Sequence, residues 1–187
     1  MRKRLITYLS LLVLANSLCV SCSKPVDFDQ INDFEINPVV ESSLIYFDEP
    51  ATSFLDNGEQ IATIQDYVQV EFFNSEFIIE NLEKAEFVFE ITNSINRDFR
   101  VRVDFFDDNS QMQHAFTIFV AASSNNAKVV SNYTEVFEDG TLEALKNTSV
   151  LVFTLNMLPG AAINQNTLGS ISLKSKAVFY LNIDSSL

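Results

Sequence analysis

Strict alternation of apolar and polar side chains is the feature that most restricts how this chain can fold. From residue 99 to residue 105, every odd position is Phe or Val, and the even positions are Arg100, Arg102 and Asp104. Because successive side chains of a β-strand point to opposite faces, this pattern predicts a strand with one buried face. Residues 85–91 and 171–183 alternate in the same way and predict two further strands.

Other segments add strands to this prediction. Asp107-Asp108-Asn109-Ser110 consists of residue types that favour turns, and residues 112–121 follow it as a second strand, so a hairpin is expected. Residues 150–158 are apolar at both odd and even positions, as is typical of a central strand. Weaker patterns predict strands near residues 34–40, 43–47 and 67–73.

Helix signals are few. Asp139 or Thr141 can cap a short helix that continues to about residue 147, and residues 81–84 predict one further helical turn. With so little helix to cover a parallel sheet, the strands favour two packed antiparallel sheets. We therefore expect an all-β, antiparallel β-sandwich, immunoglobulin-like in arrangement, with one short helix near residues 139–147. The chain has no Trp, so a Cys–Trp–Cys pattern does not support membership of the immunoglobulin family.

The first 22 residues have the organisation of a secretory signal. Arg2-Lys3-Arg4 forms a positive start, and residues 5–18 are mostly apolar. This stretch is too short and too interrupted by polar residues to span a bilayer comfortably. The chain has only two cysteines, Cys19 and Cys22, and both lie at the end of this segment.

This segment resembles the signal of bacterial lipoproteins, in which an apolar residue and two mostly small residues precede a Cys that becomes diacylated. Cys19-Val20-Ser21-Cys22 fits that pattern with Cys22 as the lipidated residue, although Cys19 replaces the usual Leu. The resemblance implies a signal peptide over residues 1–21, an acylated and tethered segment over 22–32, and a β-sandwich domain over 33–187. Ser23, instead of Asp, implies the outer membrane of a Gram-negative envelope.

The alternative for the two cysteines is a Cys-x-x-Cys redox or metal pair. A redox pair needs a surrounding fold, and a metal site needs further ligands. Neither is visible in the sequence, so the lipoprotein signal is favoured. Two or three acyl chains would hold the protein at a membrane permanently, since each buried methylene contributes about 0.8 kcal/mol.

The charge of the chain restricts its partners. Its net charge is −13, and removal of three of the 12 basic residues with the signal, but none of the 25 acidic ones, gives −16. Such a chain is repelled by nucleic acid. Beyond the membrane contacted through Cys22, we expect other envelope proteins or a polysaccharide as partners, and no cofactor.

Candidate catalytic groups are scarce. His114 is the only histidine and lies among apolar residues of the expected strand at 112–121, so we expect it to be packed and hydrogen-bonded. Asp107, Asp108 and Asn109 are weak candidates for binding Ca²⁺, but their spacing does not match a calcium loop, and a hairpin turn is favoured. Aromatic side chains able to stack on sugars are Tyr67, Tyr133 and Tyr180.

Three functions remain open. The first is a non-enzymatic binding or assembly module in the outer membrane or at the cell surface. The alternative is an envelope hydrolase that cleaves glycans with two carboxylates about 5–10 Å apart in a concave site. The third is a passive structural lipoprotein that meets its partner through an exposed sheet edge.

Overall fold

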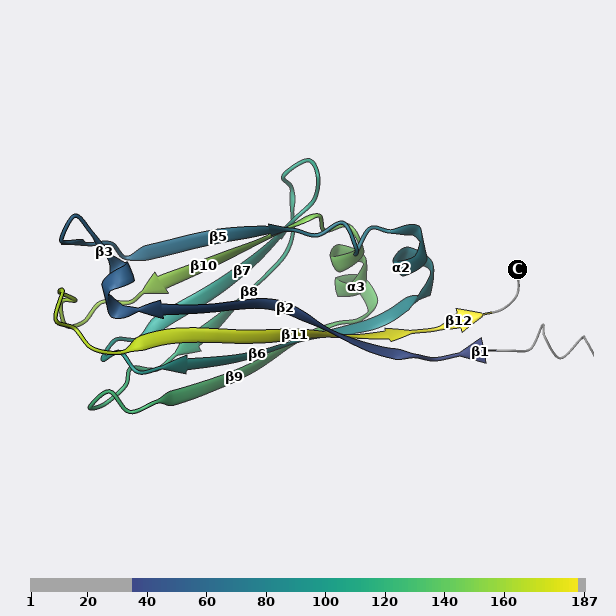
Figure 1. The fold of residues 1–187 in the computed structure, drawn as a ribbon. Helices are drawn as coiled ribbons and strands as arrows, with labels where there is room; N and C mark the ends of the chain where they lie inside the picture. The colour runs from purple at the N-terminus through teal and green to yellow at the C-terminus, as the bar shows by residue number, and fades with distance from the viewer. Residues whose placement is uncertain (1–34, 185–187) are drawn as a thin grey trace, which may run out of the picture. The chain divides into compact units, whose positions relative to one another are not determined.

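Two four-stranded antiparallel sheets form most of this computed structural model, which describes residues 35–184 (Figure 1). In spatial order, the first sheet contains β2 (Val39–Pro50), β11 (Ser170–Leu181), β6 (Leu82–Asn93) and β9 (Val129–Phe137). The second contains β5 (Thr63–Gln69), β10 (Val150–Met157), β7 (Phe99–Phe106) and β8 (Met112–Val120). The expected signal, Cys22 and the tether lie outside the described residues.

The strand order is that of a jelly roll, an antiparallel sandwich of eight strands. The chain passes from one sheet to the other between β2 and β5, β5 and β6, β6 and β7, β8 and β9, β9 and β10, and β10 and β11, so that only β7 and β8 follow each other within one sheet. The predicted β-sandwich is therefore confirmed. The immunoglobulin-like arrangement is replaced by the jelly roll, because the first long strand pairs with the last, β11, and not with its successor.

Short elements complete the described structure. At one end, β1 (Glu35–Ile36) pairs with β12 (Ile183–Asp184). A two-residue hairpin joins β3 (Leu55–Asp56) to β4 (Glu59–Gln60). Its central residues, Asn57 and Gly58, both have positive φ, as Asn-Gly hairpin turns require. The helical elements are η2 (Ala51–Phe54), α2 (Glu76–Asn81) and α3 (Asp139–Lys146).

Several predicted elements are confirmed. β7 and β8 form the expected hairpin, and the predicted short helix is α3. β10 is a central strand between β5 and β7. Its outward side chains are only half-buried, however, because no layer covers that face of the sheet among the described residues. On β11, the odd-numbered residues Ile171, Leu173 and Phe179 are buried as their alternation predicted.

Other predictions are corrected by the structure. β9 was not predicted, because its apolar residues occupy both odd and even positions. The strand expected at residues 67–73 is β5, which begins and ends four residues earlier. The helical turn expected at residues 81–84 is also misplaced, since α2 ends at Asn81 and β6 begins at Leu82. The two weak strands near residues 34–40 and 43–47 correspond mainly to one long strand, β2.

Phenylalanine dominates the core between the sheets. Ring centroids lie 4.9 Å apart in the Phe87–Phe137 pair and 5.1 Å apart in the Phe54–Phe99 pair, in tilted arrangements that aromatic pairs favour. Since both cysteines lie outside the described residues, this core is held together by burial and hydrogen bonding. The buried phenylalanines are Phe54, Phe73, Phe87, Phe89, Phe99, Phe105, Phe116, Phe137, Phe153 and Phe179.

The described chain begins and ends at the same end of the sandwich. Glu35 is the register partner of Asp184, and Figure 1 shows β1 and β12 at the end that also carries α2 and α3. The crossings between the sheets that contain α2 and α3 lie at this end, and the other crossings lie at the opposite end (Figure 1). A partner bound there would be the length of the sandwich away from the point where the chain enters the domain.

Buried backbone contacts order the loops at this opposite end. The fully buried side chain of Asn93 donates to the carbonyl oxygens of Arg97 and Ala121, both at 2.8 Å, and accepts from the backbone N–H of Ile95. Gly169 approaches the same loop closely: a Cβ atom there would lie 2.4 Å from the carbonyl oxygen of Ser94. These contacts tie the connection after β6 to the neighbouring loops.

Candidate functional site

The two long sides of the sandwich differ in how they are closed. On one side, the edge strands are β2 of the first sheet and β5 of the second. On the other side, the edge strands are β8 and β9. Cavities open between β2 and β5, whereas polar side chains join β8 to β9. We call the two adjacent cavities on the open side the lateral groove.

The first cavity of the lateral groove has a volume of about 360 Å³. It lies between β2 and the connection that follows β5, and its walls are mainly apolar. Phe72, at its margin, remains 49% exposed even though its ring is 5.3 Å from that of Phe179. Large exposed aromatic groups beside a cavity are typical of binding surfaces. The apolar residues lining this cavity include Val40, Leu44, Val70, Phe72, Phe73 and Phe179.

The second cavity, of about 310 Å³, lies between β2 and β5 themselves. Phe153 and Leu155, from the central strand β10, reach its wall, so the groove exposes the margin of the core. Leu44 lines the first cavity and Ile45 the second, which makes the two cavities neighbours along β2. The apolar residues lining the second cavity include Ile45, Phe47, Ile64, Val68, Phe153 and Leu155.

A β-bulge in β2 separates the two cavities. Leu44 and Ile45 together lie opposite Ser175 of β11, because Tyr46 pairs with Lys174 and Ser43 pairs with Lys176. The hydroxyl group of Ser175 accepts from the backbone N–H of Ile45 at 3.0 Å and donates to its carbonyl oxygen at 2.9 Å. Bulges redirect side chains at sheet edges. Here the bulge places two successive apolar residues on the lateral groove.

Two carboxylates face the second cavity from opposite edges. Glu49 pairs in register with Ile171, a core residue, and Asp66 pairs with Phe153. Because paired residues point to the same face of a sheet, both carboxylates lie on the core-facing side of their strands. Neither cavity is lined by a Lys or an Arg. The lateral groove is therefore apolar along its floor and negatively charged where the two edges approach each other.

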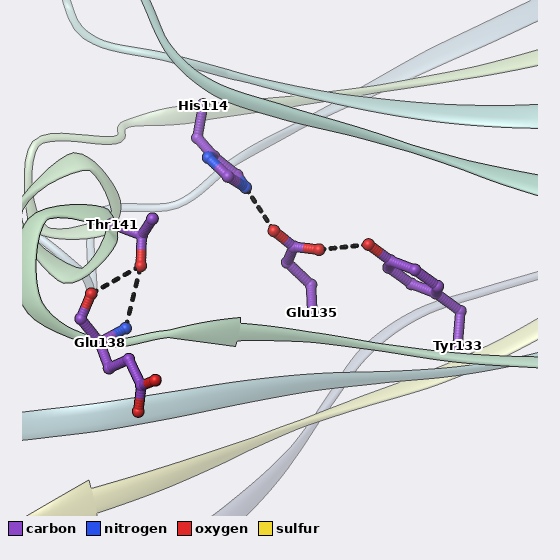
Figure 2. A network of polar contacts seen from close by, with 5 residues as sticks. All are labelled: His114, Tyr133, Glu135, Glu138 and Thr141. Carbon is purple, nitrogen blue, oxygen red and sulfur yellow. Dashed lines mark hydrogen bonds and ion pairs between the residues drawn. The ribbon is translucent and has the colours of Figure 1, made fainter.

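The closed side contains a polar network that we call the seam clasp: His114, Glu135 and Tyr133 (Figure 2). Nε2 of His114, on β8, lies 2.6 Å from Oε1 of Glu135, on β9. The hydroxyl group of Tyr133 donates to Oε2 of the same carboxylate at 2.5 Å. An ionised carboxylate only accepts hydrogen bonds, so Nε2 carries the proton. One carboxylate thus joins the two sheets.

The seam clasp is partly buried and surrounded by aromatic rings. The ring of His114 lies edge-on to Phe105 and Phe137, and the ring of Tyr133 stacks on Phe116 with centroids 5.3 Å apart. Burial, together with the hydrogen bond to Glu135 and its negative charge, raises the pKa of Tyr133 to about 12. The expectation that His114 is packed and hydrogen-bonded is confirmed.

Glu135 is the member of the clasp that the sequence did not reveal. It lies on β9, whose core-facing residues include Tyr133 and Glu135 itself, so no apolar alternation marks the strand. The sequence offers one indication of the clasp: Glu135 stands two positions after Tyr133, so in a strand both side chains point to the same face. Figure 2 also shows Thr141, whose hydroxyl group accepts from the backbone N–H of Glu138 at 3.0 Å and fixes the start of α3 beside the clasp.

Asp107, Asp108 and Asn109 form a turn, as favoured from the sequence. Oδ1 of Asp107 accepts from the backbone N–H groups of Asn109 at 2.9 Å and Gln111 at 2.8 Å, and Oδ2 accepts from the side chain of Gln113. This carboxylate is therefore engaged within the hairpin. Among the described residues, no group of three or more His, Cys, Asp or Glu side chains is placed to hold a metal ion.

The three candidate sugar-stacking tyrosines do not form one surface. Tyr67 is 67% exposed on the outward face of β5, whereas Tyr133 belongs to the seam clasp. Tyr180 lies on the other sheet, with its hydroxyl group 3.3 Å from Glu86 and Lys84 above its ring. Of these three tyrosines, only Tyr67 has an outward, largely exposed ring.

Within residues 35–184, no helix has the length and apolar character needed to cross a membrane.

No protein-family model matches this chain, and no curated protein matches it. Among solved structures, it is similar to infectious bursal disease virus, Gx strain, with 7% identity and a TM-score of 0.44 over 83% of this chain. It is also similar to the VP2 subviral particle of that virus (7% identity, TM-score 0.45, 79% of this chain). The chain spans 35% and 33% of those two viral chains.

A CBM4 structure is similar over 63% of this chain and 60% of its own, with 11% identity and a TM-score of 0.33. At these identities and TM-scores, the likenesses say nothing about a ligand or an activity.

Proposed function

We propose that this chain is a lipid-anchored, non-enzymatic binding or assembly module of the outer membrane or cell surface that holds a partner in the lateral groove. The observation that carries the proposal is the difference between the two sides of the sandwich. One side is joined by the seam clasp, whereas the other leaves two apolar cavities of about 360 and 310 Å³ beside the core. Preformed apolar cavities of this size are typical of binding sites.

The anchor in this proposal is Cys22, on the strength of the lipoprotein-like signal. We expect the intact mass of the membrane-associated protein to correspond to a chain that begins at Cys22 and carries acyl groups. A Cys22→Ala variant should lack the added mass and be released from membranes, because the thiol that receives the lipid is gone. An unmodified wild-type chain that retains Cys19 would contradict the anchor and restore the possible thiol pair.

Photo-cross-linking in intact cells tests the lateral groove. We expect p-benzoylphenylalanine at Phe72, which lines the first cavity, to give a discrete adduct under illumination. The matched control is the same substitution at Phe119, which is 65% exposed on β8, at the other side of the molecule. Both positions accept a large aromatic side chain at the surface.

A discrete adduct from Phe72 and none from Phe119 supports binding in the groove. The same adduct should disappear when the groove is altered by Val40→Asn and persist in Val130→Asn. Equal adducts from Phe72 and Phe119, or none from either, would show that the groove is not the binding surface.

A second candidate function rests on Glu49 and Asp66. Both carboxylates face the second cavity from opposite edges, which is the kind of concave, two-carboxylate arrangement that glycan hydrolysis uses. If the chain is such a hydrolase, release of reducing ends from purified envelope polysaccharide should be abolished by either Glu49→Gln or Asp66→Asn. Absence of turnover in the wild-type chain, or turnover that survives both substitutions, would eliminate this candidate.

A further inference from the structure

We propose that the occupant of the lateral groove is an extended polypeptide segment of a partner protein, which adds to β2 as a further strand and turns both apolar and basic residues toward the groove. This inference rests on the proposed function, since it names the class of partner held at the same site.

The backbone of β2 provides the first argument. β2 pairs only with β11 within the described sheets, so backbone N–H and C=O groups along its other edge face the groove and not a neighbouring strand. β2 also lines both cavities, from Val40 to Glu49, whereas β5 lines only the second. A strand laid along these residues of β2 would extend about 33 Å, at roughly 3.3 Å per residue.

The cavities provide the second argument. Alternate side chains of an added strand point to the same face, and those that face the core would enter the two cavities. The bulge at Leu44 and Ile45 lies between the cavities, so one apolar side chain or more can be placed on either side of it. This arrangement selects a segment with separated apolar residues in preference to a single compact apolar ligand.

Charge provides the third argument. Glu49 and Asp66 face the second cavity, and neither cavity has a Lys or Arg in its lining. Glu41, beside the first cavity, is already paired with Lys176 at 2.9 Å. Basic residues on the groove-facing side of the added strand would therefore complement Glu49 and Asp66. Such charge complementarity acts on specificity and on the rate of association.

The same carboxylates disfavour two other occupants. A second copy of the chain would bring its own Glu49 and Asp66 to the shared edge, and inward-facing charges on edge strands are a known protection against self-pairing. Residues 23–34 of this chain carry three Asp residues against one Lys, so they also meet the groove with like charge. A basic segment of another protein meets neither obstacle.

Binding of defined peptides tests the proposal. The probes are fluorescein-labelled octapeptides in which Ser occupies every second position and the other positions face the groove. These positions hold Lys and Val in turn in the Lys–Val peptide, Glu and Val in turn in the Glu–Val peptide, and Lys alone in the third, and each peptide is titrated against the full-length protein by fluorescence anisotropy. We expect saturable binding of the Lys–Val peptide and at least about tenfold weaker binding of both others, since each lacks one of the two features. Equal binding of all three would overturn the proposal.

Two matched substitutions locate the peptide. Val40 and Val130 are exposed valines on the two opposite edge strands of one sheet, β2 and β9, but only Val40 lines the groove. We expect Val40→Asn to weaken the Lys–Val peptide about tenfold, as loss of one buried aliphatic group predicts, and Val130→Asn to leave it within about twofold. Circular dichroism should show both variants folded, and an equal effect of the two substitutions would contradict the site.

Charge reversal tests the contribution of the carboxylates separately from that of the apolar contacts. With Glu49→Lys and Asp66→Lys combined, the Lys–Val peptide should bind about tenfold more weakly and the Glu–Val peptide should become the better ligand. An unchanged preference would show that these carboxylates do not contact the segment.

Backbone methylation distinguishes strand addition from other peptide binding. In an extended strand, N–H groups of alternate residues point to opposite edges. In the Lys–Val peptide, methylating all Ser nitrogens or all Lys and Val nitrogens should therefore abolish binding in one case and spare it in the other. Two equally active methylated peptides would overturn strand addition.

The outcomes separate this inference from the proposed function. An adduct from Phe72 in cells without binding of the Lys–Val peptide would keep the groove as a binding site and exclude a basic strand as its occupant. An adduct of twice the chain mass would identify a second copy instead, and an adduct with polysaccharide would identify a glycan. Failure of both cross-linking and peptide binding would remove both proposals.

Discussion

A single carboxylate closes one side of the sandwich. Glu135 receives one hydrogen bond from His114 on the facing sheet and one from Tyr133 on its own strand. Partly buried carboxylates are costly unless they are bonded in this way, so each donor stabilises the position of the other. The arrangement satisfies the polar groups of three side chains that lie next to a core of phenylalanine rings.

The raised pKa of Tyr133 predicts how the stability of the fold depends on pH. Its pKa is raised from 10.0 to about 12 in the folded protein, so the folded state holds the phenol proton more tightly than the unfolded chain. The associated stability is complete below about pH 10 and is lost as the pH rises toward about 12. Urea unfolding over this range should show the decline in wild type and its reduction in Tyr133→Phe, which keeps the ring.

Removing the charge of Glu135 tests the cause of this pKa. In Glu135→Gln, the pKa of Tyr133 should fall toward its ordinary value, because the carboxylate that opposes ionisation is gone while the burial remains. Phenolate absorbance during an alkaline titration reports the change. A Tyr133 pKa that stays near 12 in this variant would assign the whole shift to burial.

The residues of the clasp were not equally predictable. His114 follows from a strand pattern in which its neighbours at even positions are apolar, so a packed histidine was expected. Glu135 belongs to a strand with polar core-facing residues, and sequence alternation cannot identify such a strand. Glu49 and Asp66 were missed for the same reason. They lie on the core-facing side of edge strands, and in the sequence an acidic residue at such a position looks the same as one that faces solvent.

At the scale of elements, β7 and β8 were predictable because local alternation and turn residues act over a few neighbouring positions. β5 was shifted and β9 was missed, because they are edge strands with weak or mixed patterns. Edge strands bury only part of one face, so their sequences are less constrained than those of central strands. The lateral groove is bordered by such strands, which is why the sequence did not indicate it.

The loop between β10 and β11 depends on one glycine. Gly169 has φ of +103°, and a Cβ atom there would lie 2.4 Å from the backbone oxygen of Ser94. Gly169→Ala should therefore destabilise the fold by more than about 2 kcal/mol, combining strain with a backbone displacement. Urea unfolding measures the loss.

Gly140→Ala is the matched control for this substitution. Gly140 lies in the first turn of α3, and a Cβ atom there meets no heavy atom within 4 Å. The substitution should leave stability unchanged or raise it by about 0.5 kcal/mol, because Ala restricts the unfolded chain. Equal losses in the two variants would show that neither clash nor φ governs the loop.

At the scale of the whole molecule, the sandwich was predictable but its strand order was not. Alternation shows which face of each strand is buried, and it does not show which strand lies beside it. The pairing of β2 with β11 joins residues more than a hundred positions apart, and nothing local encodes it. The jelly roll therefore emerged only from the structure, and with it the groove between β2 and β5.

The pairing of Glu35 with Asp184 has a mechanical consequence. If the chain is anchored through Cys22 as proposed, tension on it enters the domain at β1 and passes directly into β2, which Figure 1 shows as a continuation of the same path. A partner strand bonded along β2 would be pulled parallel to its length. Because hydrogen bonds between antiparallel strands lie perpendicular to them, such a pull shears many bonds at once and does not open them one by one. A tethered complex of this geometry would resist force better than its equilibrium affinity suggests.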